Sequence, residues 1–203
     1  MKYYVLLMAI AGICILFSSC CKAQITYKDT SNTAPQSIDL GKVLIVYYSK
    51  SGKTKEVAEI IQKCTNGTLY RIETQKKYLK VSIMIALDAK KELESDNLPE
   101  LSTAAPDVSA YDLIIVGSPT WRYTVATPVL SFLAQCNFGG KRVAAYATNT
   151  GNVGTFFDLF QQRAQNAILL TGEEFHNKLS GKAELNKKIK NWLNKITILK
   201  FEE

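Results

Sequence analysis

Hydroxyl side chains recur through one short segment, Ser49-Lys50-Ser51-Gly52-Lys53-Thr54. A continuous apolar run precedes this segment and helically spaced apolar residues follow it, so the segment is expected to join a strand to the start of a helix. The N–H groups and the positive dipole end at a helix start favour a bound anion, and the two lysines add positive charge. The segment therefore predicts a phosphate-binding loop.

Other interpretations of this segment are possible from the residues alone. The serines could simply cap the helix, and that alternative stays open. A Walker A nucleotide loop would need glycine at position 47, where the chain has Tyr47. A phosphoacceptor receiver domain is also excluded, because no aspartate ends the preceding strand.

Two later loops carry groups that suit a flat ligand. In Pro119-Thr120-Trp121-Arg122-Tyr123, two large aromatic side chains could stack on a planar ring, although they could equally fold back onto the core. In Thr148-Asn149-Thr150-Gly151-Asn152, small side chains and a glycine allow the backbone to approach a ligand closely. Ser118 lacks the context of a hydrolase nucleophile, and His176 has no partner in a matching catalytic motif.

Alternating strand and helix patterns position these loops. Apolar, β-branched runs predict five strands, at 42–48, 68–73, 111–117, 141–147 and 167–171. Apolar residues at helical spacing predict helices within 57–64, 83–94, 127–133, 155–165 and 185–196. This alternation predicts an α/β fold, a doubly wound five-stranded parallel sheet with helices on both faces. Such sheets bind ligands at the carboxyl ends of their strands, where all three loops fall.

Together, the three loops resemble those of the flavodoxin family, which binds flavin mononucleotide (FMN). The resemblance runs from about Lys42 to Ile196 and implies the strand order 2-1-3-4-5. The family's first loop reads T-x-T-G-x-T and holds the 5′-phosphate, while the other two flank the isoalloxazine ring. The implied cofactor-binding residues are Ser49, Lys50, Ser51, Gly52, Lys53, Thr54, Pro119, Thr120, Trp121, Arg122, Tyr123, Thr148, Asn149, Thr150, Gly151 and Asn152.

The resemblance implies an FMN-binding redox protein that transfers electrons through its flavin. Three roles follow: an electron carrier that docks on a redox partner protein, an FMN-dependent reductase of small acceptors such as quinones, or a binding module that has lost the flavin. The family's electron carriers are usually acidic, whereas this chain carries a formal net charge of +7.

The first 40 residues do not fit the domain pattern. Lys2 and the apolar run from Tyr4 to Phe17 resemble a secretory signal, because the run is shorter than the roughly 18–20 residues of a membrane span. Leu16-Phe17-Ser18-Ser19-Cys20 resembles a bacterial lipobox with lipidation at Cys20; cleavage near Ala23 or an uncleaved anchor are the alternatives. We therefore expect a signal peptide at 1–19, a flexible tether at 20–40 and the folded domain at 41–203, held at the cell envelope on the periplasmic side or the outer membrane by a lipid anchor in the membrane.

The remaining composition excludes other classes of site. No nucleic-acid motif accompanies the basic charge, and export argues against a nucleic-acid partner. Cys64 and Cys136 are isolated, with no metal-ligand spacing around them. A disulfide between them is possible in an exported protein, but nothing in the sequence requires it.

Overall fold

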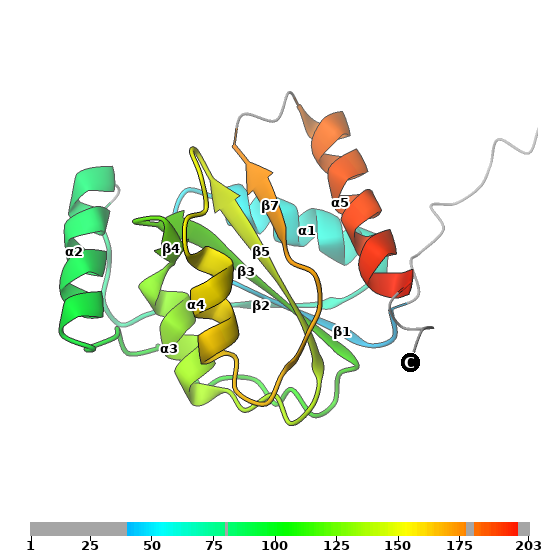
Figure 1. Cartoon of the computed structure of the whole chain (residues 1–203), viewed down its shortest axis with the longest axis horizontal. Coiled ribbons are helices and arrows are strands. Elements are labelled where there is room, and N and C mark those ends of the chain that lie inside the picture. Colours follow the sequence, from blue (N-terminus) through cyan, green and yellow to red (C-terminus); the bar gives the residue numbers. More distant parts are fainter. Residues whose placement is uncertain (1–39, 80, 178–180, 199–203) are drawn as a thin grey trace, which may run out of the picture. The chain divides into compact units, whose positions relative to one another are not determined.

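The structure is a computed structural model that describes residues 40–79, 81–177 and 181–198 (Figure 1). The expected signal peptide, Cys20 and nearly all of the tether lie outside these residues. The strands are β1 (Val43–Tyr47), β2 (Thr68–Arg71), β3 (Leu113–Trp121), β4 (Thr124–Val125), β5 (Arg142–Asn149), β6 (Ile168–Leu169) and β7 (Glu173–His176). The helices are α1 (Lys53–Thr65), α2 (Ser82–Glu94), α3 (Thr127–Gln135), α4 (Phe156–Arg163) and α5 (Lys182–Ile198).

One sheet runs through the domain in the order β2-β1-β3-β5-β6. These neighbours pair in parallel, which agrees with the order 2-1-3-4-5 expected from the sequence, β5 being the fourth strand of that scheme. The order reverses between β1 and β3, so the loops after these two strands and after β5 lie at one edge of the sheet. The short β4 pairs antiparallel with the end of β3 and closes a tight turn there.

The fifth strand differs from the prediction of a single strand at 167–171. Two short strands occupy its position: β6 pairs with the start of β5, and β7 pairs with the end of β5. Gly172, between them, carries no side chain, and a Cβ there would lie 2.3 Å from the ring of Phe157. The strand is therefore interrupted where α4 packs closely, and its second half lies further along the chain than the apolar run suggested.

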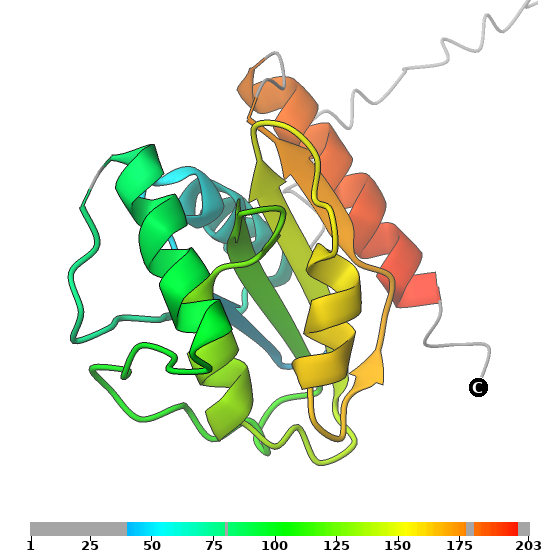
Figure 2. The ribbon, with the colours of Figure 1, turned by 60° about the vertical axis from the view of Figure 1, so that its left-hand side comes forward.

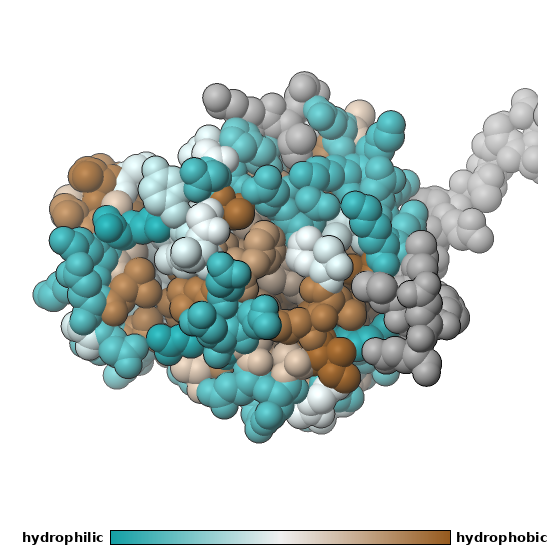
Figure 3. Space-filling model, viewed as in Figure 1, coloured by the Kyte–Doolittle hydropathy of each residue, from teal (hydrophilic) through white to brown (hydrophobic). Residues whose placement is uncertain are grey.

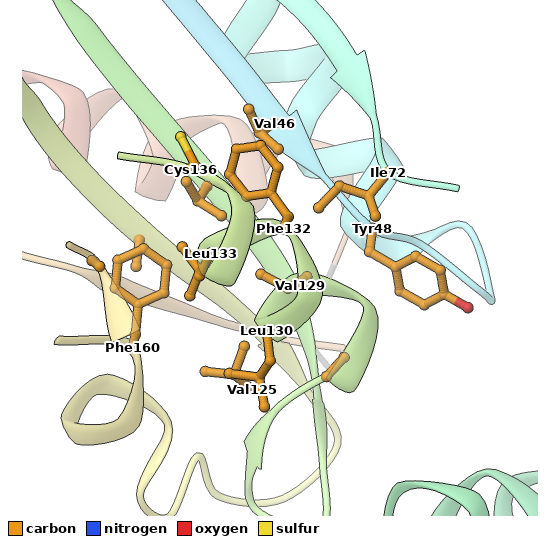
Figure 4. Packing of buried hydrophobic residues seen from close by; sticks show 14 of the residues in the cluster. Val46, Tyr48, Ile72, Val125, Val129, Leu130, Phe132, Leu133, Cys136 and Phe160 are labelled. Carbon is orange, nitrogen blue, oxygen red and sulfur yellow. The ribbon is translucent and has the colours of Figure 1, made fainter. Parts of the chain in front are cut away.

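Helices cover both faces of the sheet because successive strand residues point to opposite sides. In β1, Leu44 and Val46 face the cluster formed with α3 and α4, while Val43 and Ile45 face α1 and α5. Figure 4 shows the first cluster, in which Val129, Leu130, Phe132 and Leu133 of α3 pack toward the sheet. The core is thus two apolar layers around the strands.

Helix α2 lies outside this sandwich. It packs beside α3 and is visible at the edge of the domain (Figure 2). Ala89 and Glu92 are buried on its inner side, whereas much of its outer side is exposed. Among the described residues, no helix combines the length and apolar character needed to cross a lipid bilayer.

Candidate functional site

A cavity of about 460 Å³ opens at the carboxyl ends of β1, β3 and β5. Its volume falls within the roughly 300–1,000 Å³ typical of small-molecule sites. All three predicted loops contribute to its wall, together with α2 and the segment after β7. The lining residues are Lys50, Ser51, Ser82, Ile85, Pro119, Thr120, Trp121, Thr148, Asn149, Thr150 and Asn177.

The first loop divides its hydroxyl groups between the cavity and its own structure. Ser51 and Lys50 line the cavity. Ser49 is buried, and its Oγ accepts a hydrogen bond from the Gly52 N–H at 3.2 Å, so it shapes the turn. Gly52 has φ 93°, a left-handed conformation that glycine adopts without strain.

The start of α1 suits an anion. Gly52 is the N-cap of this helix and offers no side-chain cap, which leaves its first N–H groups to a ligand or water. The ammonium group of Lys50 donates to the carbonyl oxygen of Tyr78, so this charge is held beside the loop. Lys53 points elsewhere, since it pairs with Glu56 at 3.4 Å and lines a smaller neighbouring cavity. Phosphate binding here therefore depends on Ser51, Lys50 and the helix N-terminus.

Thr54 connects the first loop to the third. Its Oγ1 lies 2.8 Å from Oγ1 of Thr148, and both side chains are buried. The carbonyl oxygen of Thr54 also accepts a hydrogen bond from the Tyr146 hydroxyl at 3.0 Å. Burial raises the pKa of Tyr146 well above its ordinary value, so this hydroxyl keeps its proton and remains a donor. These two bonds fix the start of α1 against the end of β5.

Gly117 is required by the same contact. It lies in β3 directly against the ring of Tyr146, where a Cβ would stand 2.0 Å from Cζ of that ring. Any side chain at position 117 would displace Tyr146 from its bond to Thr54. A glycine in the middle of an otherwise apolar strand thus marks a close approach that positions the first loop.

The second loop contributes three residues to the cavity lining, and one of them also packs against the core. Pro119, Thr120 and Trp121 line the cavity. Trp121 is buried, and its ring meets Tyr48 and Tyr78 edge-on, with centroids 5.5 Å and 4.9 Å away. It therefore folds back onto the core, as one of the two alternatives allowed, while one side of the residue still borders the cavity.

Arg122 and Tyr123 lie away from the cavity lining. They form the two-residue turn between β3 and β4, with φ values of 50° and 62°. Left-handed conformations at both positions are the geometry of a tight hairpin turn that asparagine and glycine usually supply. Tyr123 is 63% exposed, so the structure does not bring these two predicted residues to the cavity.

The third loop contributes Thr148, Asn149 and Thr150 to the cavity wall. Gly151 and Asn152 are exposed beyond it and do not line it. Asn149 Nδ2 donates to a carboxylate oxygen of Glu174 at 3.3 Å, which fixes its side chain in one orientation.

Two unpartnered side-chain atoms belong to residues that line the cavity. In the described part of the chain, four buried side-chain atoms lack a hydrogen-bond partner, and two of them, Thr120 Oγ1 and Asn149 Oδ1, belong to cavity-lining residues. A buried polar atom without a partner costs about 1–3 kcal/mol. A flat ring bearing N–H and carbonyl groups at its edge offers partners for oxygens of these types, so the chemistry of these residues fits the isoalloxazine of a flavin.

A buried carboxylate holds the outer wall of the site. Glu92 of α2 accepts hydrogen bonds from the Tyr78 hydroxyl at 3.0 Å and from Thr127 Oγ1 at 2.6 Å. Lys76 lies 2.6 Å from the same carboxylate, and it also pairs with Asp88. Burial, with a further contribution from Glu92, raises the pKa of Tyr78 well above its ordinary value. The network therefore joins α2, α3 and the segment that contacts Trp121 and Lys50.

Three lining residues were absent from the sequence prediction. Asn177 directly follows β7, and a correct placement of that strand would have put it at a strand end. Ser82 and Ile85 belong to α2, which reaches the cavity through tertiary packing, and no local motif marks them. Cys64 and Cys136 are both free thiols. Burial raises the pKa of Cys64 and raises that of Cys136 to about 11, so neither is a reactive thiolate at neutral pH. No potential metal-binding group occurs among the described residues.

Comparison with known proteins agrees with this geometry. A solved flavoprotein from Lactobacillus acidophilus in complex with FMN superposes with a TM-score of 0.62 at 24% identity, covering 75% of this chain and 98% of that one. The apo form of a flavoprotein from the same species gives 0.54 at 26% identity, covering 68% and 93%. An NAD(P)H dehydrogenase (quinone) from Paraburkholderia phymatum is 26% identical over 66% of this chain and 71% of its own length.

The sequence profile of one family also matches the chain. That profile, described as flavodoxin, covers residues 42–196, which contain every element of the sheet and the whole cavity wall. The matched range coincides with the one, about Lys42 to Ile196, over which the loop motifs suggested the same relationship. The chain therefore belongs to the flavodoxin family.

Proposed function

We propose that this protein binds FMN and acts as a redox protein of the bacterial cell envelope, exchanging electrons with a partner through the bound flavin. The observation that carries the proposal is the cavity at the strand ends, where all three loops meet. Two of its lining residues, Thr120 and Asn149, have a buried side-chain oxygen without a hydrogen-bond partner. The FMN complex of the Lactobacillus acidophilus neighbour supports the choice of flavin.

Each part of the cavity has a separate task in this proposal. The N-terminus of α1, with Ser51 and Lys50, would hold the phosphate. Thr120 and Asn149 would bond the polar edge of the ring, while Pro119 and Trp121 would exclude water from its apolar part. When bound, FMN supplies reversible electron transfer, and the chain orients it and sets its electrostatic surroundings.

The proposal is tested by adding FMN to the purified, flavin-free protein. Binding should quench flavin fluorescence and shift the visible absorption bands, with a 1:1 endpoint. Ser51→Ala and Thr120→Val should each weaken binding, whereas Ile168→Ser, an exposed change at the opposite end of the sheet, should not. A wild-type protein that ignores FMN at high concentration would leave the flavin-free binding module as the correct interpretation.

A second candidate function is an FMN-dependent reductase of small acceptors such as quinones. The similarity to an NAD(P)H dehydrogenase (quinone) favours it. Flavin-loaded protein should then turn over a soluble quinone repeatedly when a chemical or nicotinamide donor is supplied. A carrier would instead be reduced and reoxidised by a partner protein, with slow turnover of the free quinone.

The envelope location rests on the amino-terminal residues. We propose that Cys20 carries the lipid anchor, on the basis of the lipobox-like segment that precedes it. Growth with labelled palmitate should label the wild-type protein, and Cys20→Ala should abolish the label and release the protein from membranes. Unlabelled wild-type protein would point instead to cleavage near Ala23 or to an uncleaved anchor.

A further inference from the structure

Exposed apolar side chains gather along the outer side of α2 and the residues that lead into it. Figure 3 shows hydrophobic side chains at the outer end of this helix, at the left of the view. Of the eight exposed large hydrophobic residues in the described part of the chain, five come from this one stretch. These five, called here the α2 ridge, are Leu79, Val81, Ile83, Met84 and Leu87.

The ridge does not belong to the core. Ile83 is 64% exposed and Leu87 is 52% exposed, and they lie four residues apart on one side of the helix. The opposite side of α2 is the one that packs inward, through Ala89 and Glu92. An apolar cluster of this kind, on a helix already anchored by its other side, marks a surface that contacts something else.

Positive charge surrounds the ridge. The chain enters it from Lys76 and Lys77 and leaves it through Lys90 and Lys91. Lys50, Arg71, Lys76 and Lys77 also line a separate cavity of about 300 Å³ immediately before the ridge. Four carboxylates nearby form ion pairs that engage both partners: Asp88 and Glu92 with Lys76, Glu94 with Lys90, and Glu73 with Arg71. Lys77 and Lys91 pair with no carboxylate in the described part of the chain, so they supply the excess positive charge beside the ridge.

We propose that the α2 ridge docks on the surface of a lipid bilayer that contains anionic phospholipids. The apolar side chains of the ridge would contact the acyl chains of such a bilayer, and the flanking lysines would contact its phosphate groups. The cationic cavity beside the ridge offers a place for one headgroup phosphate. Charge complementarity thus favours an anionic bilayer over a second copy of this basic chain, whose own lysines would be brought together.

Docking in this orientation would hold the redox site near the membrane, with α2 between them. Ser82 and Ile85 belong to the same helix as the ridge and line the cavity at the strand ends. This consequence rests on the proposed function, but bilayer docking itself does not require bound flavin.

The test uses a chain from Pro35 to Glu203, which lacks the apolar leader and Cys20. The buried hydrophobic residues of the described chain all lie between Leu40 and Ile196, so the shortened chain keeps this whole core. The chain is sedimented with vesicles of phosphatidylcholine, with and without phosphatidylglycerol. We expect binding to the anionic vesicles, weakened by salt, and little binding to the neutral ones.

Matched variants distinguish binding through the ridge from non-specific adsorption through any exposed apolar side chain. Ile83→Ser with Leu87→Ser should weaken partitioning roughly tenfold or more. Ile168→Ser with Leu169→Ser removes two exposed apolar side chains at the amino end of β5 and should change nothing. Circular dichroism confirms that each variant is folded. Equal binding by both double variants, or no binding by the wild-type chain, would overturn the proposal.

Two further outcomes distinguish the alternatives. Sedimentation equilibrium without vesicles reveals whether the wild-type chain forms a dimer that the ridge variant loses; such a result, without vesicle binding, would assign the ridge to a second copy and overturn bilayer docking. Repeating the vesicle assay with and without FMN separates this inference from the proposed function. If the protein binds vesicles but fails to bind FMN, bilayer docking through the ridge is supported and the proposed FMN-binding function is contradicted.

Discussion

The hydroxyl oxygens of Thr54 and Thr148 lie 2.8 Å apart, although the two residues are 94 positions apart in the sequence. This buried hydrogen bond joins the start of α1 to the carboxyl end of β5. It thereby holds the part of the site suited to phosphate at a fixed distance from the part suited to a ring. The relationship yields a direct test of how the site is assembled.

Replacing both of these threonines should destabilise the protein by less than the sum of the two single replacements. Thr148→Val leaves the buried Thr54 hydroxyl without this partner, which should cost about 1–3 kcal/mol of unfolding free energy. Thr54→Val with Thr148→Val should cost less than the sum of the single changes, because two apolar groups of similar shape then meet. Urea unfolding of the flavin-free proteins gives the three values, and strict additivity would contradict the coupling.

Thr120→Val should change stability and ligand binding in opposite directions. The hydroxyl of Thr120 is buried without a partner, so its removal should leave the flavin-free protein as stable as the wild type or about 1 kcal/mol more stable. The same change should weaken FMN binding by roughly fivefold to tenfold, because a bond to the ring edge is lost. Thermal unfolding and fluorescence titration measure the two effects. Loss of stability in the flavin-free variant would show that the hydroxyl already has a partner.

Gly117→Ala should be among the most damaging small changes in the sheet. The new methyl group would overlap the ring of Tyr146, which is fully buried and cannot move into solvent. We expect a loss of about 3 kcal/mol or more in unfolding free energy. Gly151→Ala is the control, since no atom lies within 4 Å of the added Cβ and the backbone there is not left-handed. Tyr146→Phe, which removes only the bond to Thr54, should cost about 1 kcal/mol. Similar losses for the two glycine variants would refute the steric argument.

Stability should fall at alkaline pH because buried tyrosines stay protonated in the folded protein. Burial raises the pKa of Tyr48 from 10.0 to about 12, partly offset by Arg71. A raised pKa means that the stabilising effect is complete below pH 10.0 and is lost as the pH rises toward 12, since only the unfolded chain releases the proton. Each such tyrosine should remove on the order of 1.4 kcal/mol per pH unit in that window.

Urea unfolding between pH 8 and pH 11.5 checks this dependence. Tyr48→Phe should reduce the slope above pH 10 without altering the plateau below it. Tyr146 and Tyr78 contribute in the same direction, so some slope should remain in the variant. A slope unchanged by Tyr48→Phe would mean that this phenol ionises normally in the folded protein.

The sequence by itself determined the fold class and the location of the site. Buried parallel strands are nearly continuous apolar runs, and helices show a 3.6-residue period, so both are legible locally. The carboxyl ends of such strands must meet at one edge, which is why the sequence alone assigns Ser51, Thr120 and Asn149 to one site. Lipidation at Cys20 stays a prediction from the sequence.

Tertiary structure decided which residues of those loops reach the cavity. Trp121 packs on Tyr48 and Tyr78, and the turn carries Arg122 and Tyr123 away from the lining, because backbone conformation and neighbouring volume fix side-chain direction. Asn177 and the α2 residues enter the site from elements whose position depends on contacts distant in sequence. A local sequence pattern determines a helix or strand and its buried side. Which side chains fill the space between two elements depends on how the elements pack in the tertiary structure.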